Sequence, residues 1–234
     1  MGALVAPFAV GGTSAAVPMN IARALPSGTG GAHPGNAPFR AARPSAITKR
    51  RQSARIASAM QAALNRECNS SLSSPAKCDA ASLRAINNAR RAEGVAPMML
   101  PPGYEQMSLV DQLVTVTNAE RVGRRLPAWE GPEQALGHLA SEGAAQGEDP
   151  SGPSGKIWAS NLATGVLTVL EADYEWMYND GPGGTNAGCT TARPSDCWAH
   201  RRNILSPWSG TMGAASQPVK GQRLVVAEVM VEDG

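Results

Sequence analysis

The sequence predicts an α+β fold, because helical periodicity dominates most of its acidic part and a β-rich segment closes it. Residues 1–78 carry nine Lys or Arg against one acid, whereas the remainder carries twelve bases against eighteen acids. All five Trp and all three Tyr also lie beyond residue 78. We therefore expect a basic, mostly disordered segment over 1–78 and one folded domain over 79–234.

Apolar residues at helical spacing, with start and stop signals, predict helices over 79–94, 108–123, 132 to 143 or 147, and 166–179. Asp79 is the expected N-cap of the first helix. Ser108 and Asp111 have the spacing of a capping box at the start of the second. The closing segment LVVAEVMV, residues 224–231, has strong β propensity and is expected to pair with residues 211–215. Helices followed by strands favour the α+β class.

The basic segment contains little that could build a core. Residues 28–38 are rich in Gly, Pro and Ala, and the basic stretch 47–60 lacks the interleaved aromatics of a nucleic-acid site, so we expect a solvated linker and no nucleic-acid partner.

The first twelve residues are an atypical secretion signal, because they carry no charge and Pro7 interrupts a short apolar run. The Arg-rich composition also allows a true start downstream of Met1. The sequence contains no stretch of 18 or more apolar residues, so we expect no transmembrane segment.

The four cysteines form two close pairs, Cys68 with Cys78 and Cys189 with Cys197. Local pairing within each is the simplest of the three possible connectivities. Metal binding is the weaker alternative, because neither pair has C-x-x-C spacing and no His accompanies the first. Two local disulfides imply an oxidising location, either extracellular or associated with the cell envelope.

The common signatures of acyl transfer, nucleotide binding and zinc proteolysis are missing from the sequence. On a helical wheel, His138 and Glu142 face away from the apolar stripe of their helix, which predicts a solvated surface pair. The same helical wheel places Glu171 and Glu175 on the side of the fourth helix opposite its apolar stripe. Asn179 lies at the edge of that stripe and is the better candidate for a position facing a cleft.

Several motifs occur in a distinctive order along the acidic part. Trp176 and Met177 are followed by AHRRNIL, residues 199–205, and the chain contains LRAINNARRAEGVAP over 83–97 and ASNLATG over 159–165. This set resembles the CAP superfamily, also called SCP-like extracellular proteins, whose bacterial members carry W-M, G-H-R-x-N-I-L and G-E-N-I-A-x-G. The closing MGAA and LVVAEVMV resemble the final hairpin of the family. The resemblance extends from about residue 82 to residue 231.

The resemblance implies a three-layer α-β-α sandwich and a secreted protein. Family members with a complete cleft use two His and two Glu, in some cases to hold a divalent metal. Here His200 matches one of the four, Ser160 replaces the Glu of G-E-N-I, and Asn179 lies three residues after the family Trp. No His occurs between Asp149 and Trp158, where the first is expected. We therefore expect no metal and no cofactor at this site.

The expected function is that of a secreted, non-catalytic domain that binds a lipid, a small apolar ligand or a cell-envelope partner. The candidate cleft residues are Ser160, Asn161, Trp176, Asn179, His200 and Asn203. One alternative is an extracellular hydrolase in which His200 is the general base, aided by Ser160 or Glu175. Another is a structural envelope protein positioned by its basic segment.

Overall fold

The computed structural model describes residues 61–70, 72–179 and 199–233. All of them belong to the compact unit Pro44–Gly234. Residues 61–69 are helical. The helices and strands that follow are α2 (Pro75–Glu93), α3 (Leu109–Val122), α4 (Gln134–Gln146), β1 (Trp158–Val166), α5 (Val169–Tyr174), the π-helical segment Glu175–Asn179, α6 (Ala199–Ile204), β2 (Gly210–Val219) and β3 (Arg223–Glu232). Short 3-10 turns occupy Tyr104–Gln106 and Lys220–Gln222.

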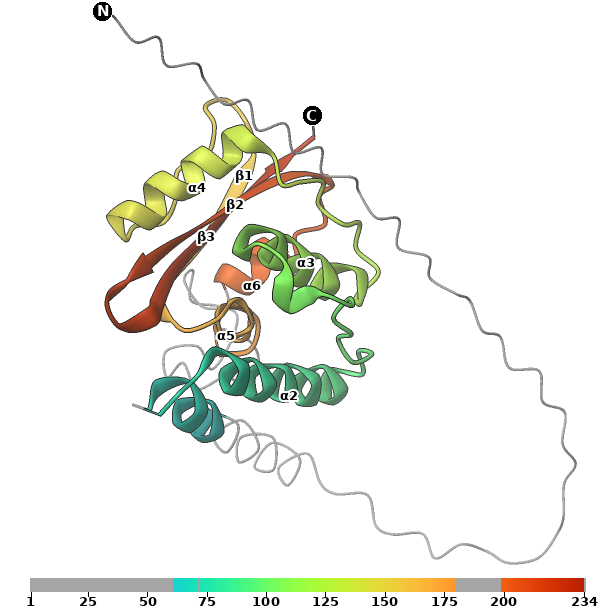
Figure 1. The fold of residues 1–234 in the computed structure, drawn as a ribbon. Helices are drawn as coiled ribbons and strands as arrows, with labels where there is room; N and C mark the ends of the chain where they lie inside the picture. The colour runs from blue at the N-terminus through green and yellow to red at the C-terminus, as the bar shows by residue number, and fades with distance from the viewer. Residues whose placement is uncertain (1–60, 71, 180–198, 234) are drawn as a thin grey trace, which may run out of the picture. The chain divides into compact units, whose positions relative to one another are not determined.

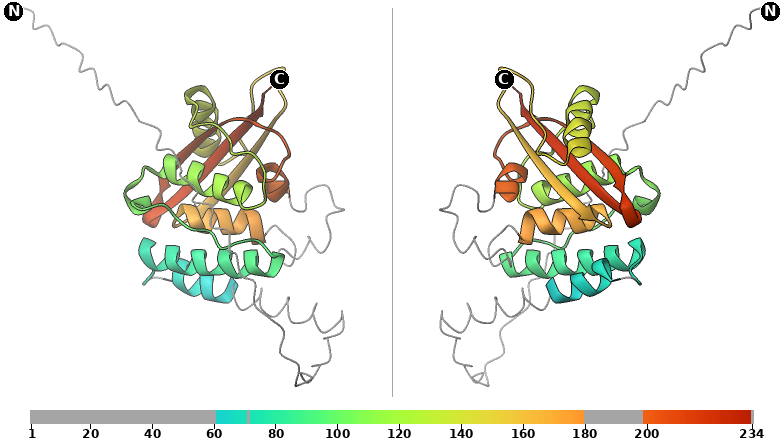
Figure 2. Two further views of the ribbon diagram at one scale, coloured as in Figure 1. Left: turned by 90° about the vertical axis from the view of Figure 1, so that its right-hand side faces the viewer. Right: turned by 90° about the vertical axis from the view of Figure 1, so that its left-hand side faces the viewer.

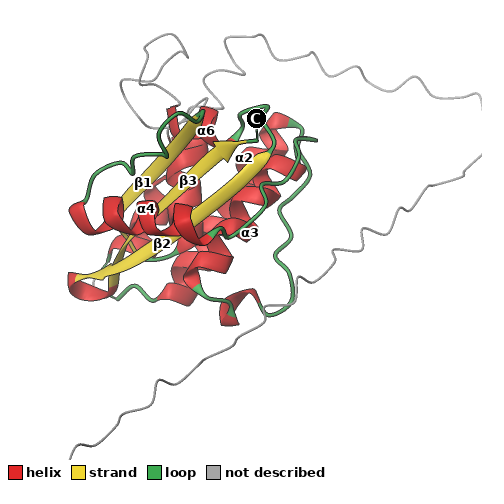
Figure 3. Cartoon of the chain, turned by 90° about the horizontal axis from the view of Figure 1, so that it is seen from above, coloured by secondary structure: helices red, strands yellow, loops and turns green. Residues whose placement is uncertain are grey.

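The sheet is antiparallel with strand order β1-β3-β2 and has helices on both faces (Figures 1 and 3). Alternation along β3 separates the two faces. Ala227 and Val229 belong to a cluster with Ala140 of α4, whereas Val226 belongs to the larger core and Glu228 bonds to Thr117 of α3. Helices α3, α5 and α6 lie on this second side. The predicted α+β class and α-β-α layering are confirmed.

Helix α2 packs on the side of α5 that faces away from the sheet, together with the helical residues 61–69 (Figure 2). It begins earlier than predicted, because Ser74 is the N-cap and Pro75 supplies a favourable first position. Asp79 therefore lies inside the helix rather than at its cap. The expected domain boundary between residues 78 and 79 also falls inside α2, and Leu64 is 2% exposed within the main core.

The second and third helices follow their predicted signals. Ser108 Oγ accepts a hydrogen bond from the Asp111 backbone N–H at 3.1 Å, which caps α3. Helix α4 begins slightly later than Pro132, because Glu133 is its N-cap, and it ends at Gly147 in the left-handed conformation. The predicted pairing of the closing strand with the segment around 211–215 is also confirmed.

The predicted helix over 166–179 begins too early, whereas the helical segment ends at Asn179 as predicted. Strand β1, which the periodicity did not indicate, extends to Val166, and the Thr168 side chain then caps α5. The helix changes to π-helical geometry at Glu175. Within the described residues, no helix is long and apolar enough to cross a membrane.

Candidate functional site

A cavity of about 450 Å³ lies where β1, the α5 and π-helical segment, and the start of α6 meet. Its lining includes residues 162–166 of β1 and the side-chain positions Asn69, Glu171, Glu175, Trp176, Asn179 and His200. Three of the predicted cleft residues, Trp176, Asn179 and His200, are thus brought together. The fold therefore joins two motifs that are separated by more than twenty residues in the sequence.

The side chain of Trp176 packs against the imidazole of His200. The indole is 2% exposed, and its Nε1 donates a hydrogen bond to the Leu162 carbonyl at 3.0 Å. The half-buried imidazole of His200 stacks on it, with ring centroids 6.5 Å apart and an interplanar angle of 28°. Since the indole is fixed by both burial and a hydrogen bond, this arrangement holds the imidazole at the cavity wall.

Glu171 is a buried carboxylate in the first turn of α5. Its Oε2 accepts a hydrogen bond from the Leu167 backbone N–H at 2.6 Å and lies 4.0 Å from Arg223 Nη1. Burial raises the pKa of Glu171, and the backbone hydrogen bonds and Arg223 partly oppose this effect. Glu171 therefore contributes a largely desolvated carboxyl group to the cavity wall.

Glu175 is the second carboxylate of the cavity and is held by two amides. Asn179 Nδ2 donates to its Oε2, and Gln61 Nε2 donates to its Oε1 at 3.4 Å. Burial raises the pKa of Glu175, whereas these two hydrogen bonds lower it. Sequence reasoning missed Gln61 and Asn69 because both lie in the segment expected to be disordered.

The helical wheel was wrong about Glu171 and Glu175, which line the cavity rather than a solvated face. The wheel assumes one apolar stripe and one exposed face, but α5 lies between α2 and the sheet and every residue from Val169 to Tyr174 is buried. The π-helical segment also changes the angle between successive residues.

The remaining candidate residues, Ser160, Asn161 and Asn203, do not line the cavity but connect α6 to β1. Asn203 Nδ2 donates to the Ser160 carbonyl at 2.8 Å and to Asn161 Oδ1 at 3.0 Å. Asn161 is fully buried and donates in turn to Glu228 Oε1 at 2.7 Å. These bonds position α6, and hence His200, against the sheet.

A buried arginine that the sequence analysis did not identify anchors the chain after α6. Arg121 is 0% exposed, donates hydrogen bonds to the carbonyls of Ile204, Ser206 and Trp208, and stacks 4.1 Å from the Trp129 ring. Burial lowers its pKa to about 10, a value at which the guanidinium still carries its charge at neutral pH. Its local sequence gives no signal, since these three acceptors lie 83, 85 and 87 residues away.

Buried carboxylates lie behind the cavity on the same side of the sheet. Burial raises the pKa of Glu228 to about 7, and hydrogen bonds from Thr117 and Asn161 oppose the shift. Burial, together with the charges of Glu120 and Glu228, raises the pKa of Asp173 well above its usual range. Among the described residues, neither carboxyl oxygen of Asp173 has a hydrogen-bond partner.

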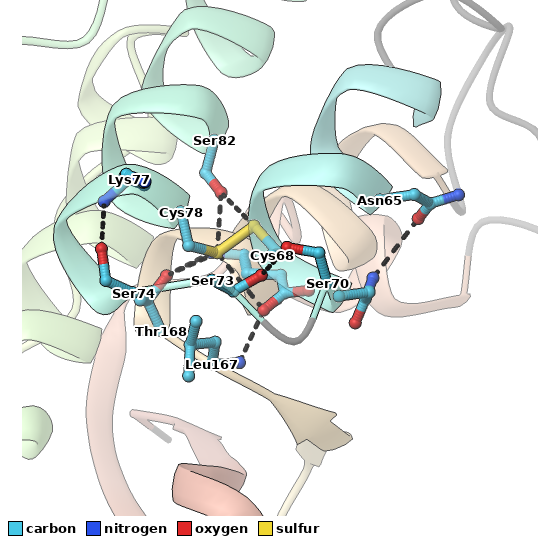
Figure 4. Close-up of a disulfide and its surroundings, with 12 residues drawn as sticks. Asn65, Cys68, Ser70, Ser73, Ser74, Lys77, Cys78, Ser82, Leu167 and Thr168 are labelled. Carbon is cyan, nitrogen blue, oxygen red and sulfur yellow. Dashed lines mark hydrogen bonds between the residues drawn. A yellow bond between two sulfur atoms is a disulfide. The ribbon is translucent and has the colours of Figure 1, made fainter.

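Two further predictions concern residues away from the cavity. His138 and Glu142 are exposed on α4, as the wheel predicted, and this helix covers the opposite face of the sheet. The predicted Cys68–Cys78 disulfide is present and buried, beside Ser82, Leu167 and Thr168 (Figure 4). The predicted Cys189–Cys197 pair lies outside the described residues.

No family model matches the chain, and no curated protein matches it. Solved structures that match include MpPR-1i, at 19% identity over 58% of this chain and 90% of that one, with a TM-score of 0.37. The same protein soaked with selenourea matches at 18% identity over 57% of this chain and 94% of that one, also with a TM-score of 0.37. Venom allergen-like protein 4 of Schistosoma mansoni matches at 14% identity over 55% of this chain and 91% of that one, with a TM-score of 0.37.

Proposed function

We propose that the chain is a CAP/SCP-like binding domain of an extracellular or cell-envelope protein, with its ligand site in the cavity beside His200. The observation that carries the proposal is the convergence of Trp176, Asn179 and His200 on one cavity. The buried Cys68–Cys78 disulfide supports an oxidising compartment, since such bonds persist mainly outside the cytosol. The proposed site needs no cofactor.

The walls of the cavity favour a small polar ligand that carries a cationic group. Glu171 and Glu175 contribute carboxylates, Asn69 and Asn179 contribute carboxamides, and His200 contributes an imidazole. An acyl chain binds best in a pocket with predominantly apolar walls, which this one lacks. Of the partners considered, a cell-envelope component with an amine or quaternary ammonium group therefore fits better than a lipid tail or a small apolar ligand.

Binding is better supported than hydrolysis. One observation favours a hydrolase, because Glu175 and His200 line the same cavity. However, both oxygens of Glu175 accept hydrogen bonds from amides, and the Ser160 side chain does not line the cavity. A hydrolase that forms a covalent intermediate requires a side-chain nucleophile within hydrogen-bond reach of its base. We therefore propose a non-catalytic role.

The proposal is tested by isothermal titration calorimetry of the full chain with choline, N-acetylglucosamine and decanoate. We expect saturable binding of choline and a loss of affinity of about tenfold or more in Glu175→Gln and His200→Ala, which is the effect of about 1.4 kcal/mol. His138→Ala is the matched control, because it removes an exposed imidazole on the opposite face of the sheet.

Three results would contradict the proposal. Saturable binding of decanoate without choline would indicate an apolar site. Binding that is equally strong in His200→Ala would place the site elsewhere. Turnover of 4-nitrophenyl acetate that His200→Ala abolishes and His138→Ala preserves would instead establish the hydrolase.

A further inference from the structure

A second group of chemically reactive side chains lies beside the cavity, around the buried disulfide. The sulfurs of Cys68 and Cys78 and a carboxylate oxygen of Glu171 all lie within 4.8 Å of one another, and all three residues are buried. Cys78 Sγ lies 3.5 Å from Glu171 Oε2, and Ser82 Oγ lies 3.9 Å from each sulfur (Figure 4). The fold therefore brings two sulfurs and one carboxylate into a single cluster.

These atoms form a donor set for a metal ion once the disulfide is reduced. Zn²⁺ binds Cys thiolates and Asp or Glu carboxylates, and three protein ligands with one open position are a common zinc arrangement. The sequence did not reveal this set, because Glu171 lies 93 residues after Cys78 and no C-x-x-C motif is present. The expectation of no metal rested on the missing family ligands near His200, and for the cysteines on their spacing and the lack of an accompanying His.

The electrostatics of the reduced state favour a cation. Two thiols would lie beside a carboxylate that is already desolvated, and Arg223 approaches Glu171 only to 4.0 Å. Buried negative groups are stabilised by a bound cation, whose charge is the largest in such a site. An ion in the cavity meets Glu171, which lines its wall.

We propose that the reduced chain binds one Zn²⁺ ion through Cys68, Cys78 and Glu171, so that this cysteine pair forms either a disulfide or a metal site. A dithiol reductant transfers two electrons and two protons to the disulfide, the sulfur–sulfur bond breaks, and the reductant leaves as a cyclic disulfide. Zn²⁺ then replaces the two thiol protons, which pass to solvent. The metal set shares Glu171 with the cavity wall, but the proposal does not depend on which ligand the cavity binds.

The experiment uses the full chain with Cys189→Ser and Cys197→Ser, so that the other cysteine pair cannot bind metal. The protein is reduced with dithiothreitol, separated from it by anaerobic gel filtration, and titrated with Cd²⁺ as a spectroscopic probe. We expect one equivalent per chain and an ultraviolet thiolate-to-cadmium charge-transfer band. Adding Cys68→Ser and Cys78→Ser should abolish the band.

The carboxylate is tested by Glu171→Gln, which should weaken Cd²⁺ binding by about tenfold or more. Glu67→Gln is the matched control, because it removes the carboxylate next to Cys68 in sequence and is not part of the donor set. X-ray absorption of the Zn²⁺-loaded protein, which needs no substitution of Glu171, should show two sulfurs at about 2.3 Å and oxygen at about 2.0–2.2 Å. Absence of binding, equal affinity in Glu171→Gln, or a zinc shell without two sulfurs would overturn the proposal.

Discussion

Replacement of Arg121 by Met should destabilise the fold strongly, because this side chain binds four backbone carbonyls inside the core. Its guanidinium donates to Pro127, Ile204, Ser206 and Trp208 at 2.7, 2.7, 2.9 and 2.5 Å. Hydrogen bonds from a charged donor contribute about 1.5–3 kcal/mol each. Desolvation of the guanidinium offsets much of that sum, but its removal leaves buried carbonyls unpaired at about 1–3 kcal/mol each, so the net loss is on the order of 3 kcal/mol. We expect a loss of this size.

The assay is equilibrium unfolding in urea, with the free energy of unfolding extrapolated to zero denaturant. Arg84→Met is the matched control, since Arg84 is exposed on α2 and its replacement should change stability by less than about 0.5 kcal/mol. The loss in Arg121→Met should be accompanied by weaker choline binding, because the released carbonyls of Ile204 and Ser206 lie at the end of α6, which carries His200. A loss below about 1 kcal/mol would refute the assignment of Arg121 as the anchor of α6.

Three further predictions concern packing, pH and the disulfide. Gly213→Ala should destabilise the fold by about 1–3 kcal/mol in urea unfolding, because a Cβ there would lie 2.2 Å from the Gly137 backbone N and 2.3 Å from the Leu136 carbonyl carbon. Gly137→Ala, across the same contact, should be neutral or stabilising by up to about 1 kcal/mol, since its Cβ would meet no atom closer than 3.6 Å; equal effects of the two would argue against this packing. Stability should fall by about 1–3 kcal/mol as pH rises from 4.5 to 7, because the folded state keeps the Glu228 proton to about pH 7 whereas the unfolded chain releases it near 4.5. Glu228→Gln should remove this part of the pH dependence, and an unchanged slope would show that another group causes it. Replacing Cys68 and Cys78 by Ser should lower the free energy of unfolding by about 2–3 kcal/mol, the entropy of closing a short loop; unchanged stability would mean that the disulfide does not constrain the unfolded chain.

The sequence predicted those features of the fold that depend on local signals. Ser108 with Asp111 identified the start of α3 and Gly94 the end of α2, and Gly147, one of the two predicted ends of α4, is its C-cap, because caps and left-handed glycines are determined by adjacent residues. The closing strand was recognisable from its β-branched run. Strand β1 was missed, because Ser, Asn, Thr and Gly fill much of its length and its pairing depends on β3.

The candidate site was predictable only in part, for a related reason. Trp176 and His200 were identified through the family motifs, and Asn179 through the motifs and the helical wheel. Glu171 was misplaced because α5 has no solvated face. The contributions of Gln61 and Asn69 come from helical residues that a composition argument assigned to a disordered segment.

The central claim, that the cavity beside His200 binds the ligand, is tested most directly by NMR of the full chain with ¹³C-labelled histidine rings. The chain has three histidines, and His200→Ala assigns the relevant signal. On titration with choline, we predict that the His200 ring signal shifts in a saturable way while that of His138, exposed on α4, stays in place. An unchanged His200 signal at saturating choline, or equal shifts of both rings, would contradict the account.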